Sequence, residues 1–323
     1  MKPTRREFLK GSFVLLGAAE LGGRGFERLS PGATAMTPRF QLSCQTLPYR
    51  ALPLRRALEG IQKAGYKYLM LYQTHAGQPV FTPVLSADER SALKKLLADF
   101  GLTVHMSFIG LGVDVKTDKG RSDYKKELDL FREFDIKTVV GIGPWGYKKF
   151  PDEPRTGPEW EKECDAFYKG FEQVVPYAEQ LGITIALKPH TGITATAKAC
   201  LQVVKRVVSD NVKICWDAGN VSFYEGINPD PDFPALAPQV RAVCIKDHRG
   251  GRANGDFPVP GQGQVDHEAM LKTLFAAGFR GPLSVERVDG KMNAAEMPAD
   301  LIDERIKEAY AFLQPLLEKC AGV

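Results

Sequence analysis

Residues 177–190 read YAEQLGITIALKPH, and this stretch carries the pattern that decides the fold. A helical segment ends at Gly182, and glycine is the residue best suited to the left-handed turn that closes a helix. Residues 183–187 then form a continuous apolar run, typical of a parallel strand that is buried on both faces. Lys188 and His190 follow on one side of the strand, because strand side chains alternate between faces.

The same order of helix, short break and apolar strand recurs along the chain. It is found at residues 51–72, 91–108, 127–143, 200–217 and 270–286, and further strands are expected at 40–45 and 240–247. Eight strands in such units predict an α/β fold of one domain, a (β/α)8 TIM barrel. A doubly wound open sheet is the alternative, but no strand is followed by the G-x-G-x-x-G loop of dinucleotide-binding folds.

The composition is that of an ordinary globular protein: 323 residues, 44% hydrophobic and 25% charged, with a formal net charge of +4. The sequence has no basic run with interleaved aromatic residues, so a nucleic-acid partner is not expected. The six cysteines form no C-x-x-C pair, which excludes a dense disulfide framework but leaves one disulfide possible. We expect most of them to be small buried residues.

The first 35 residues resemble a twin-arginine export signal. Arg5 and Arg6 precede a modestly apolar stretch, and Ala33-Thr34-Ala35 matches an A-x-A cleavage site. This interpretation predicts recognition by the twin-arginine export machinery, removal of residues 1–35, and a periplasmic or extracellular barrel over residues 36–323. The apolar stretch is too short and too rich in glycine for a stable membrane anchor. An amphipathic first helix is the alternative.

Polar residues gather where the predicted strands end, and in a barrel these carboxyl ends carry the chemistry. The residues are Lys188 and His190 after the fifth strand, Asp217 and Asn220 after the sixth, Cys244, Lys246 and His248 along the seventh, and Glu286 and Arg287 after the eighth. A buried ammonium group needs a partner, so we expect Lys188 to face Asp217 and Glu286. A charged lysine there stabilises an enolate oxygen, and a neutral one is a base.

Several other polar or aromatic residues have structural interpretations. Asp247 is expected to cap the loop after the seventh strand, and His248 is either a loop residue or a substrate ligand. Trp145 and Tyr224 are expected either to line the mouth of the barrel or to form a partner interface. Structural roles are also predicted for the remaining histidines, His75, His105 and His267.

Four stretches of the sequence resemble the xylose-isomerase-like barrel superfamily, in its sugar phosphate isomerase/epimerase branch. They are WDAGNVSFYEG (216–226), VCIKDHRGG (243–251), PVPGQGQVDHEAML (258–271) and GPLSVERVDG (281–290). The resemblance implies a divalent metal, which is manganese, magnesium or zinc, held by Glu, Asp, His and Glu residues from strands five to eight. It also implies proton transfer between adjacent carbons of a sugar through an enediolate.

Two of the four metal ligands that the resemblance implies are replaced in this chain. Asp217 and Glu286 match, but the Glu of strand five falls on Lys188 and the His of strand seven falls on Cys244. An ammonium group repels a nearby cation, so these substitutions favour a metal-free site in which Lys188 takes the place of the cation. If a metal is bound, the expected ligands are Asp217 and Glu286 with His190, Cys244 or His248.

The sequence therefore predicts an exported carbohydrate-active enzyme, similar to an isomerase or epimerase. It would remove a proton next to a carbonyl of a sugar or keto sugar, with Glu286 or Lys188 as the base. The residues expected to be catalytic are Lys188, Glu286 and Asp217, and those expected to bind the substrate are His190, Asn220, Lys246, His248 and Arg287. Two alternatives stay open: an enolate-type lyase acting on oxidised (keto) glycosides, and a non-catalytic sugar-binding barrel that has lost the metal site.

Overall fold

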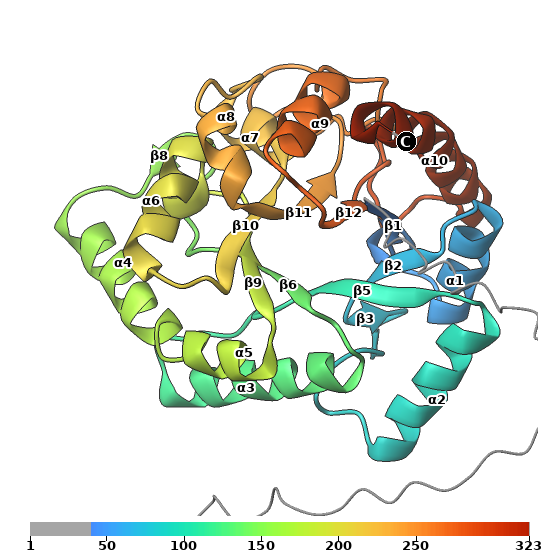
Figure 1. Ribbon diagram of the computed structural model, residues 1–323, viewed down its shortest axis with the longest axis horizontal. Coiled ribbons are helices and arrows are strands. Elements are labelled where there is room, and N and C mark those ends of the chain that lie inside the picture. The colour runs from blue at the N-terminus through green and yellow to red at the C-terminus, as the bar shows by residue number, and fades with distance from the viewer. Residues whose placement is uncertain (1–39, 323) are drawn as a thin grey trace, which may run out of the picture. The chain divides into compact units, whose positions relative to one another are not determined.

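The computed structural model describes residues 40–322, in which eight parallel strands close into a barrel in the order β1-β12-β11-β10-β9-β6-β5-β2 (Figure 1). The strands are β1 (Gln41–Gln45), β2 (Tyr68–Leu71), β5 (Thr103–Phe108), β6 (Thr138–Gly141), β9 (Thr184–Leu187), β10 (Val212–Trp216), β11 (Val240–Ile245) and β12 (Pro282–Val285). Each strand lies within one of the eight predicted units, so the predicted TIM barrel is confirmed. The predicted export signal lies outside the described residues.

Helices surround the barrel and connect each strand to the next (Figure 1). They are α1 (Leu54–Lys63), α2 (Ala87–Asp99), α3 (Asp118–Glu133), α4 (Pro158–Phe171), α5 (Val175–Leu181), α6 (Ala197–Val207), α7 (Ala218–Glu225), α8 (Phe233–Leu236), α9 (His267–Ala276) and α10 (Ala299–Ala321). The short 3-10 helices are η1 (Leu47–Tyr49), η2 (Gly192–Thr194) and η3 (Ala237–Gln239). Two antiparallel hairpins lie in the loops after β2 and β6: β3 (Thr74–His75) with β4 (Gln78–Pro79), and β7 (Tyr147–Lys149) with β8 (Glu153–Pro154).

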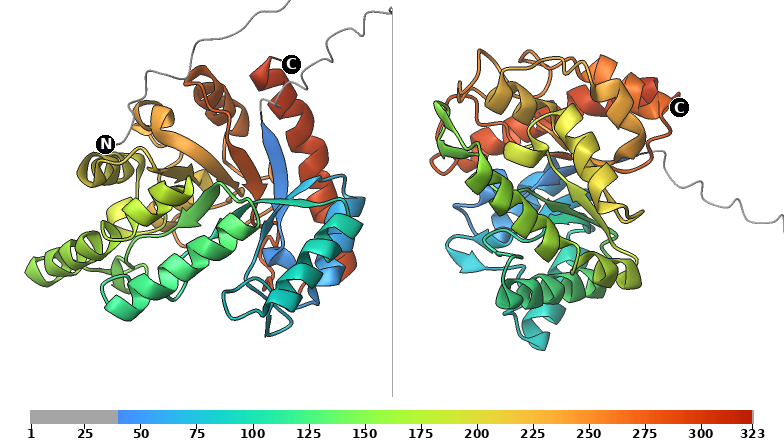
Figure 2. Two further views of the ribbon diagram at one scale, coloured as in Figure 1. Left: turned by 60° about the horizontal axis from the view of Figure 1, so that its bottom comes forward. Right: turned by 90° about the vertical axis from the view of Figure 1, so that its left-hand side faces the viewer.

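The two ends of the described chain meet where the barrel closes. β1 pairs with β12, with Cys44 opposite Val285, and α10 packs beside α1. Figure 2 shows the last helix running alongside the first strand. Closure pairs every strand on both sides, so the barrel has no exposed sheet edge.

Local sequence explains where several elements begin and end. Gly182 ends α5 with φ at 66°, so the left-handed turn predicted before β9 is present. Ser86 begins α2 in a capping box with Glu89, in which each side chain accepts a hydrogen bond from the backbone N–H of the other residue. These caps satisfy backbone groups that a helix end would otherwise leave unpaired.

The side chains that point into the barrel change from apolar to charged along the strands. The apolar members form one cluster: Met70, Met106, Phe108, Val140, Ala186, Cys215, Ala242 and Cys244. Two residues further along, the same inward-facing series reaches Lys188 after Ala186, Asp217 after Cys215, and Lys246 after Cys244. The period of two therefore delivers the charged residues to the carboxyl mouth of the barrel.

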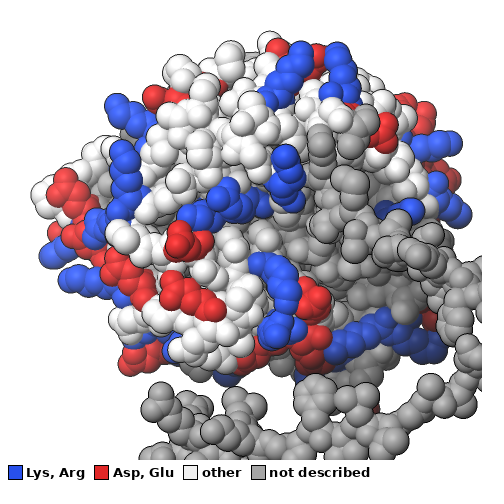
Figure 3. All heavy atoms as spheres, in the orientation of Figure 1, with Lys and Arg blue, Asp and Glu red and all other residues white. Residues whose placement is uncertain are grey.

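The expectation that most of the cysteines are buried is confirmed. All six cysteines are free thiols and five of them are buried. Among residues 40–322, no helix combines the length and the apolar character needed to cross a membrane. Figure 3 shows Lys and Arg side chains intermixed with Asp and Glu over the described part of the face that it draws.

Candidate active site

A pocket of about 330 Å³ lies at the carboxyl ends of the barrel strands, where the sequence predicts the chemistry. Six of the eight residues expected at the site line it: Lys188, His190, Asn220, Lys246, Glu286 and Arg287. The other two, Asp217 and His248, are buried and do not line it. We call this hollow the first pocket.

Lys188 and Glu286 form a buried ion pair in the first pocket. The Lys188 Nζ donates to Glu286 Oε1 at 2.9 Å and to Oε2 at 2.8 Å. The two residues follow β9 and β12, which are separated in the barrel by β10 and β11, so their side chains meet across the mouth. The carboxylate partner that the sequence predicts for Lys188 is therefore present.

Lys246 joins the same group of charges from the end of β11. Its Nζ donates to Glu286 Oε1 at 3.0 Å and to Asn220 Oδ1 at 2.9 Å, and it lies 3.2 Å from Asp217 Oδ2. Lys188 Nζ lies 3.4 Å from the same oxygen of Asp217. Two ammonium groups thus bridge two carboxyl groups, and we call these four residues, Lys188, Asp217, Lys246 and Glu286, the charged cluster.

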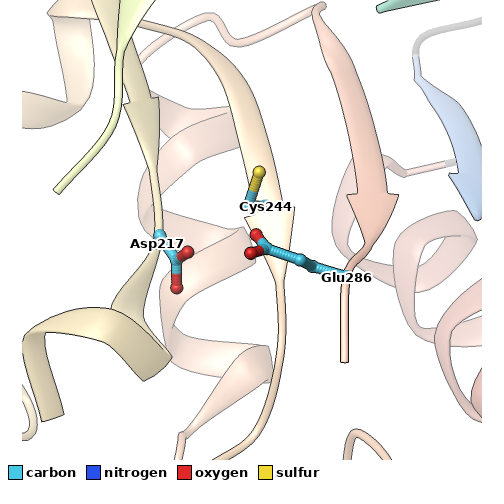
Figure 4. Close-up of side chains that lie close together, drawn as sticks. All are labelled: Asp217, Cys244 and Glu286. Carbon is cyan, nitrogen blue, oxygen red and sulfur yellow. The ribbon is translucent and has the colours of Figure 1, made fainter. Parts of the chain in front are cut away.

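Asp217 links the charged cluster to the backbone. Its Oδ1 accepts a hydrogen bond from the N–H of Asn220 at 2.9 Å, which makes it the N-cap of α7. Its Oδ2 faces the two lysines but accepts no hydrogen bond within the described chain. Figure 4 shows the carboxyl groups of Asp217 and Glu286 pointing toward one another across β11, where Cys244 lies.

Burial and the neighbouring charges shift the pKa values of the cluster in different directions. Burial lowers the pKa of Lys188, but Glu286 and Asp217 more than offset this and raise it well above its usual value. Burial raises the pKa of Glu286, but Lys188 and Lys246 outweigh it and hold the pKa below its usual range. For Asp217 burial prevails over the lysines and its pKa is raised. Asp217 is therefore the carboxyl group that takes up a proton first as the pH falls.

His190 stands at the aromatic side of the first pocket. Its Nε2 lies 3.0 Å from the hydroxyl of Tyr224, and its ring is 5.4 Å from that of Trp145. Burial, together with Lys188 and Lys246, lowers the pKa of His190 to about 3, so the imidazole is neutral near pH 7. Trp145 and Tyr224, for which the sequence left two interpretations, both lie at the mouth of the barrel.

Arg287 is fixed at the rim of the first pocket. Its guanidinium pairs with the carboxylate of Asp289 and lies 3.8 Å from the centroid of the Phe257 ring. This double contact leaves the guanidinium partly exposed and held in one place. The role of Arg287 in holding substrate oxygens stays a prediction, and its position at the rim is compatible with that role.

The predicted structural interpretation of Asp247 is confirmed, and His248 belongs with it rather than with the first pocket. The carboxylate of Asp247 accepts hydrogen bonds from the backbone N–H groups of His248, Gly261, Gly263 and Val265. His248 is buried, with its ring nitrogens 2.7 Å from the Ser222 hydroxyl and 2.7 Å from the carbonyl of Asn254. Both ring nitrogens have partners within the protein, which favours the loop interpretation, and a role of His248 in binding substrate or metal stays a prediction.

The residues at the family's metal position do not suit a divalent cation. One potential ligand atom each from Asp217, Cys244 and Glu286 lies within 4.8 Å of the others (Figure 4). However, both carboxyl groups already lie 2.8–3.4 Å from ammonium groups, which repel a cation. Burial and the Cys215 thiol raise the pKa of Cys244 well above its usual value, whereas metal binding requires a thiolate.

The fold and the site together define a TIM-barrel protein with a polar pocket at its carboxyl mouth. Residues 58–316 match the family described as xylose isomerase-like TIM barrel, and the chain belongs to this family.

Similar proteins include several that are named inosose dehydratase. That of Serratia proteamaculans (strain 568) is 25% identical over 145 residues, which are 40% of this chain and 47% of that protein. That of Geobacillus kaustophilus (strain HTA426) is 22% identical over 264 residues, 70% of this chain and 82% of that protein. The chain thus spans about half the length of the first relative and most of the second.

Solved structures of similar proteins share the fold. The D-allulose 3-epimerase of Methylomonas sp. superposes with a TM-score of 0.66 at 19% identity, covering 86% of this chain and 98% of that one. At this identity the likeness shows the fold alone.

Three features of the site were missed or underrated from the sequence. Lys246 was assigned to substrate binding, whereas it is as deeply involved in the charged cluster as Lys188. Asp289 and Phe257 were not singled out, although they hold Arg287. The spacing of Asp289, two residues after Arg287, is the one signal that points to it.

Proposed function

We propose that this protein is a sugar-modifying enzyme that removes a proton from the carbon next to a carbonyl group and stabilises the resulting enolate. The observation that carries the proposal is the charged cluster, which presents a carboxylate and two ammonium groups to one pocket. Epimerisation and dehydration, reactions named for members of this family, can both begin with such a proton removal. A carbonyl oxygen that becomes negative needs fixed positive donors, which the lysines supply.

Glu286 is the better candidate for the base. Lys188 is held in its charged form by two carboxyl groups, so it has no lone pair with which to take a proton. Glu286 is ionised and lines the first pocket, while Asp217 is ionisable but buried away from it. We therefore assign Asp217 as a positioning residue that holds Lys188 and Lys246 and begins α7.

Substrate binding would strengthen Glu286 as a base. In the free protein its carboxylate accepts three hydrogen bonds from the two lysines, which lower its pKa. A substrate carbonyl oxygen placed between the lysines competes for the same N–H donors. Each lysine N–H that hydrogen-bonds the substrate oxygen instead of Glu286 makes Glu286 more basic. The same hydrogen bond makes the C–H next to the substrate carbonyl more acidic.

Neutral His190, together with Asn220 and Arg287, is placed to hold hydroxyl groups of a sugar. His190 and Asn220 line the first pocket beside the lysines, and Arg287 lies at its rim. A neutral imidazole both donates and accepts hydrogen bonds, which suits hydroxyl groups. We propose a small carbohydrate, a keto sugar or a related carbonyl compound, as the ligand.

The test is exchange of a sugar proton with solvent. Wild-type protein in deuterated buffer, incubated with a panel of ketoses and keto glycosides, should incorporate deuterium next to the carbonyl of one of them, as read by NMR. Glu286→Gln should lose this exchange while sugar binding persists. A wild-type protein that binds sugars without any exchange would leave only the sugar-binding alternative.

Product analysis in the same tubes distinguishes the two catalytic alternatives. An isomerase or epimerase returns the proton to the sugar, so the product keeps every substituent. A lyase acting on a keto glycoside releases an alcohol and leaves a carbon–carbon double bond beside the carbonyl.

We also propose that the chain is exported through the twin-arginine pathway. The support is the pair Arg5 and Arg6 ahead of an apolar stretch and the Ala33-Thr34-Ala35 site. Cell fractionation should find the wild-type chain, shortened by about 35 residues, outside the inner membrane. Replacing both arginines by lysine should keep it inside at full length, and an unchanged distribution would refute export by this route.

A further inference from the structure

A second pocket lies beside the first at the carboxyl mouth of the barrel. It measures about 310 Å³ and is lined by the loops that follow β5 and β6. Trp145 lines this second pocket, and its ring lies 5.4 Å from His190 and 6.0 Å from Tyr224, both of which line the first. The indole of the second pocket therefore packs against two residues that line the first.

The second pocket contains a buried hydroxyl group without a partner. Tyr124, on α3, lines the pocket and is 3% exposed, yet its hydroxyl makes no hydrogen bond within the described chain. Leaving such a group unpaired is unfavourable, because it has given up its hydrogen bonds to water. Most buried hydroxyl groups in folded proteins have a partner, and a ligand or an ordered water in the pocket can supply one here.

Trp145 is also unusual in its exposure. It is 41% exposed, although its ring packs edge-on against Phe150 at 6.2 Å and lies 5.9 Å from Tyr147. Neighbouring rings hold the indole in place, so its free surface is presented without loss of side-chain freedom on binding. A fixed aromatic surface of this kind suits the C–H face of a sugar ring.

The rim of the second pocket is polar and carries both signs of charge. Asp114, Lys116 and Glu163 line it, and Lys116 Nζ lies 3.8 Å from Asp114 and 3.6 Å from Glu163. These groups offer both donors and acceptors around an otherwise apolar hollow, which is the usual make-up of a small-molecule site.

We propose that the second pocket binds a second sugar ring attached to the ring held in the first pocket, so that the ligand is a two-ring glycoside. The inference rests on the proposed function for the place of the reacting sugar. Trp145 packs on the second ring and the Tyr124 hydroxyl hydrogen-bonds one of its oxygens.

The test compares one-ring and two-ring ligands by calorimetry on the full protein. The one-ring probes are methyl glucoside, methyl galactoside and methyl mannoside, and each is paired with a methyl disaccharide that contains the same ring. None of these probes has a free carbonyl group, so the measurement reports binding and does not depend on turnover. In at least one pair the two-ring ligand should bind about tenfold tighter or more.

Two variants separate the second pocket from the first. Tyr124→Phe removes only a hydroxyl without a partner, so the fold should be kept and the two-ring advantage should fall severalfold. Trp145→Ala should remove most of the advantage while the affinity for one ring stays within about twofold. Tyr310→Phe, on the outer helix α10, is the matched control and should change neither affinity.

Some outcomes would overturn the proposal. These are equal affinity within every pair, no binding of any two-ring probe, or an advantage that both variants retain. Failure of the proposed function gives a different result, because deuterium exchange is then absent while the two-ring preference and its loss in the variants remain.

Discussion

Lys246 is as important to the site as Lys188, because its ammonium group lies 3.0 Å from Glu286 and 3.2 Å from Asp217. Each lysine contacts both carboxyl groups, so the positive charge near the pocket is shared between two side chains. A divalent cation at the same carboxyl groups would be repelled by both ammonium groups, and removing one of them weakens this repulsion. The charged cluster therefore supplies from protein groups the positive charge that the family resemblance assigns to a metal.

Replacing Lys188 by methionine should abolish turnover. Met keeps most of the volume of the side chain but removes one donor to the enolate oxygen, and we expect a loss of about 10²- to 10³-fold. Steady-state kinetics on the substrate found by deuterium exchange would measure it. Lys213→Met is the matched control, since Lys213 is a strand lysine that pairs with Asp210 and Gln239 outside the pocket.

Stability must be followed in the same variant, because Lys188→Met leaves two carboxyl groups with one ammonium partner. Breaking a buried ion pair costs about 3–5 kcal/mol. The double variant Lys188→Met with Glu286→Gln should recover much of this stability and stay inactive. Full activity in the single variant would contradict the role given to Lys188.

A second prediction at the residue scale concerns metals. Wild-type protein should keep its activity after dialysis against a chelator, because its charged cluster does not favour a divalent cation. The variant Lys188→Glu with Cys244→His restores the family's donor set and should bind about one Mn²⁺ or Zn²⁺ per chain. Elemental mass spectrometry and calorimetric titration measure this, and stoichiometric metal in the chelated wild-type protein would contradict it.

At the scale of elements, Asp247 organises the long connection between β11 and α9. Four backbone N–H groups converge on its carboxylate, those of Gly261 and Gly263 on Oδ2 and those of His248 and Val265 on Oδ1. A side chain on Gly263 would not fit, because a Cβ there would lie 2.2 Å from Asp247 Oδ1. These contacts hold the loop that places Phe257 in the lining of the first pocket.

Asp247→Asn should destabilise this connection. An amide in place of the carboxylate brings an N–H group toward the N–H donors that face Oδ2, and we expect a loss of about 3 kcal/mol in the free energy of unfolding. Denaturant unfolding and faster amide hydrogen exchange over residues 258–266 would report it. Asp266→Asn is the control, since asparagine also caps a helix well and Asp266 is the N-cap of α9.

At the scale of the whole molecule, Glu127 couples stability to pH. It lies on α3, 9% exposed, and accepts a hydrogen bond from the N–H of Gly110 at 2.7 Å. Burial, as the largest effect, raises its pKa from 4.5 to about 7. The folded state therefore holds a proton there between these pH values, whereas the unfolded chain has lost it.

This coupling makes the folded protein less stable as the pH rises from about 4.5 to about 7. Glu127→Gln carries no titrating group, so relative to wild type it should gain up to about 3 kcal/mol between pH 4 and pH 8. Denaturant unfolding at several pH values measures the gain. Glu133→Gln, on the same helix, should show none, because Lys94 holds the pKa of Glu133 below its usual value. Equal pH profiles for wild type and Glu127→Gln would contradict the prediction.

The sequence by itself determined the barrel and the side of it that carries the chemistry. Three features are local: apolar strands such as 183–187, helix-ending glycines such as Gly182, and the charged residues that stand two positions past the inward-facing Ala186, Cys215 and Cys244. Local geometry decides them, because a strand has a period of two and a helix ends where the left-handed conformation is allowed. The confirmed strands and the six pocket residues that were predicted follow from these rules.

Only the tertiary structure decided which of these residues touch. Lys246 reaches both Glu286 and Asp217, and His248 turns away to Ser222, and neither outcome follows from spacing along the chain. The same holds for Trp145, which lines the second pocket and packs against Tyr224 of the first because the loop after β6 meets α7. Closure of the barrel sets these distances. Burial then requires each charged side chain of the site to lie beside a group of opposite charge, because an unpaired ion is unfavourable in a low-dielectric interior.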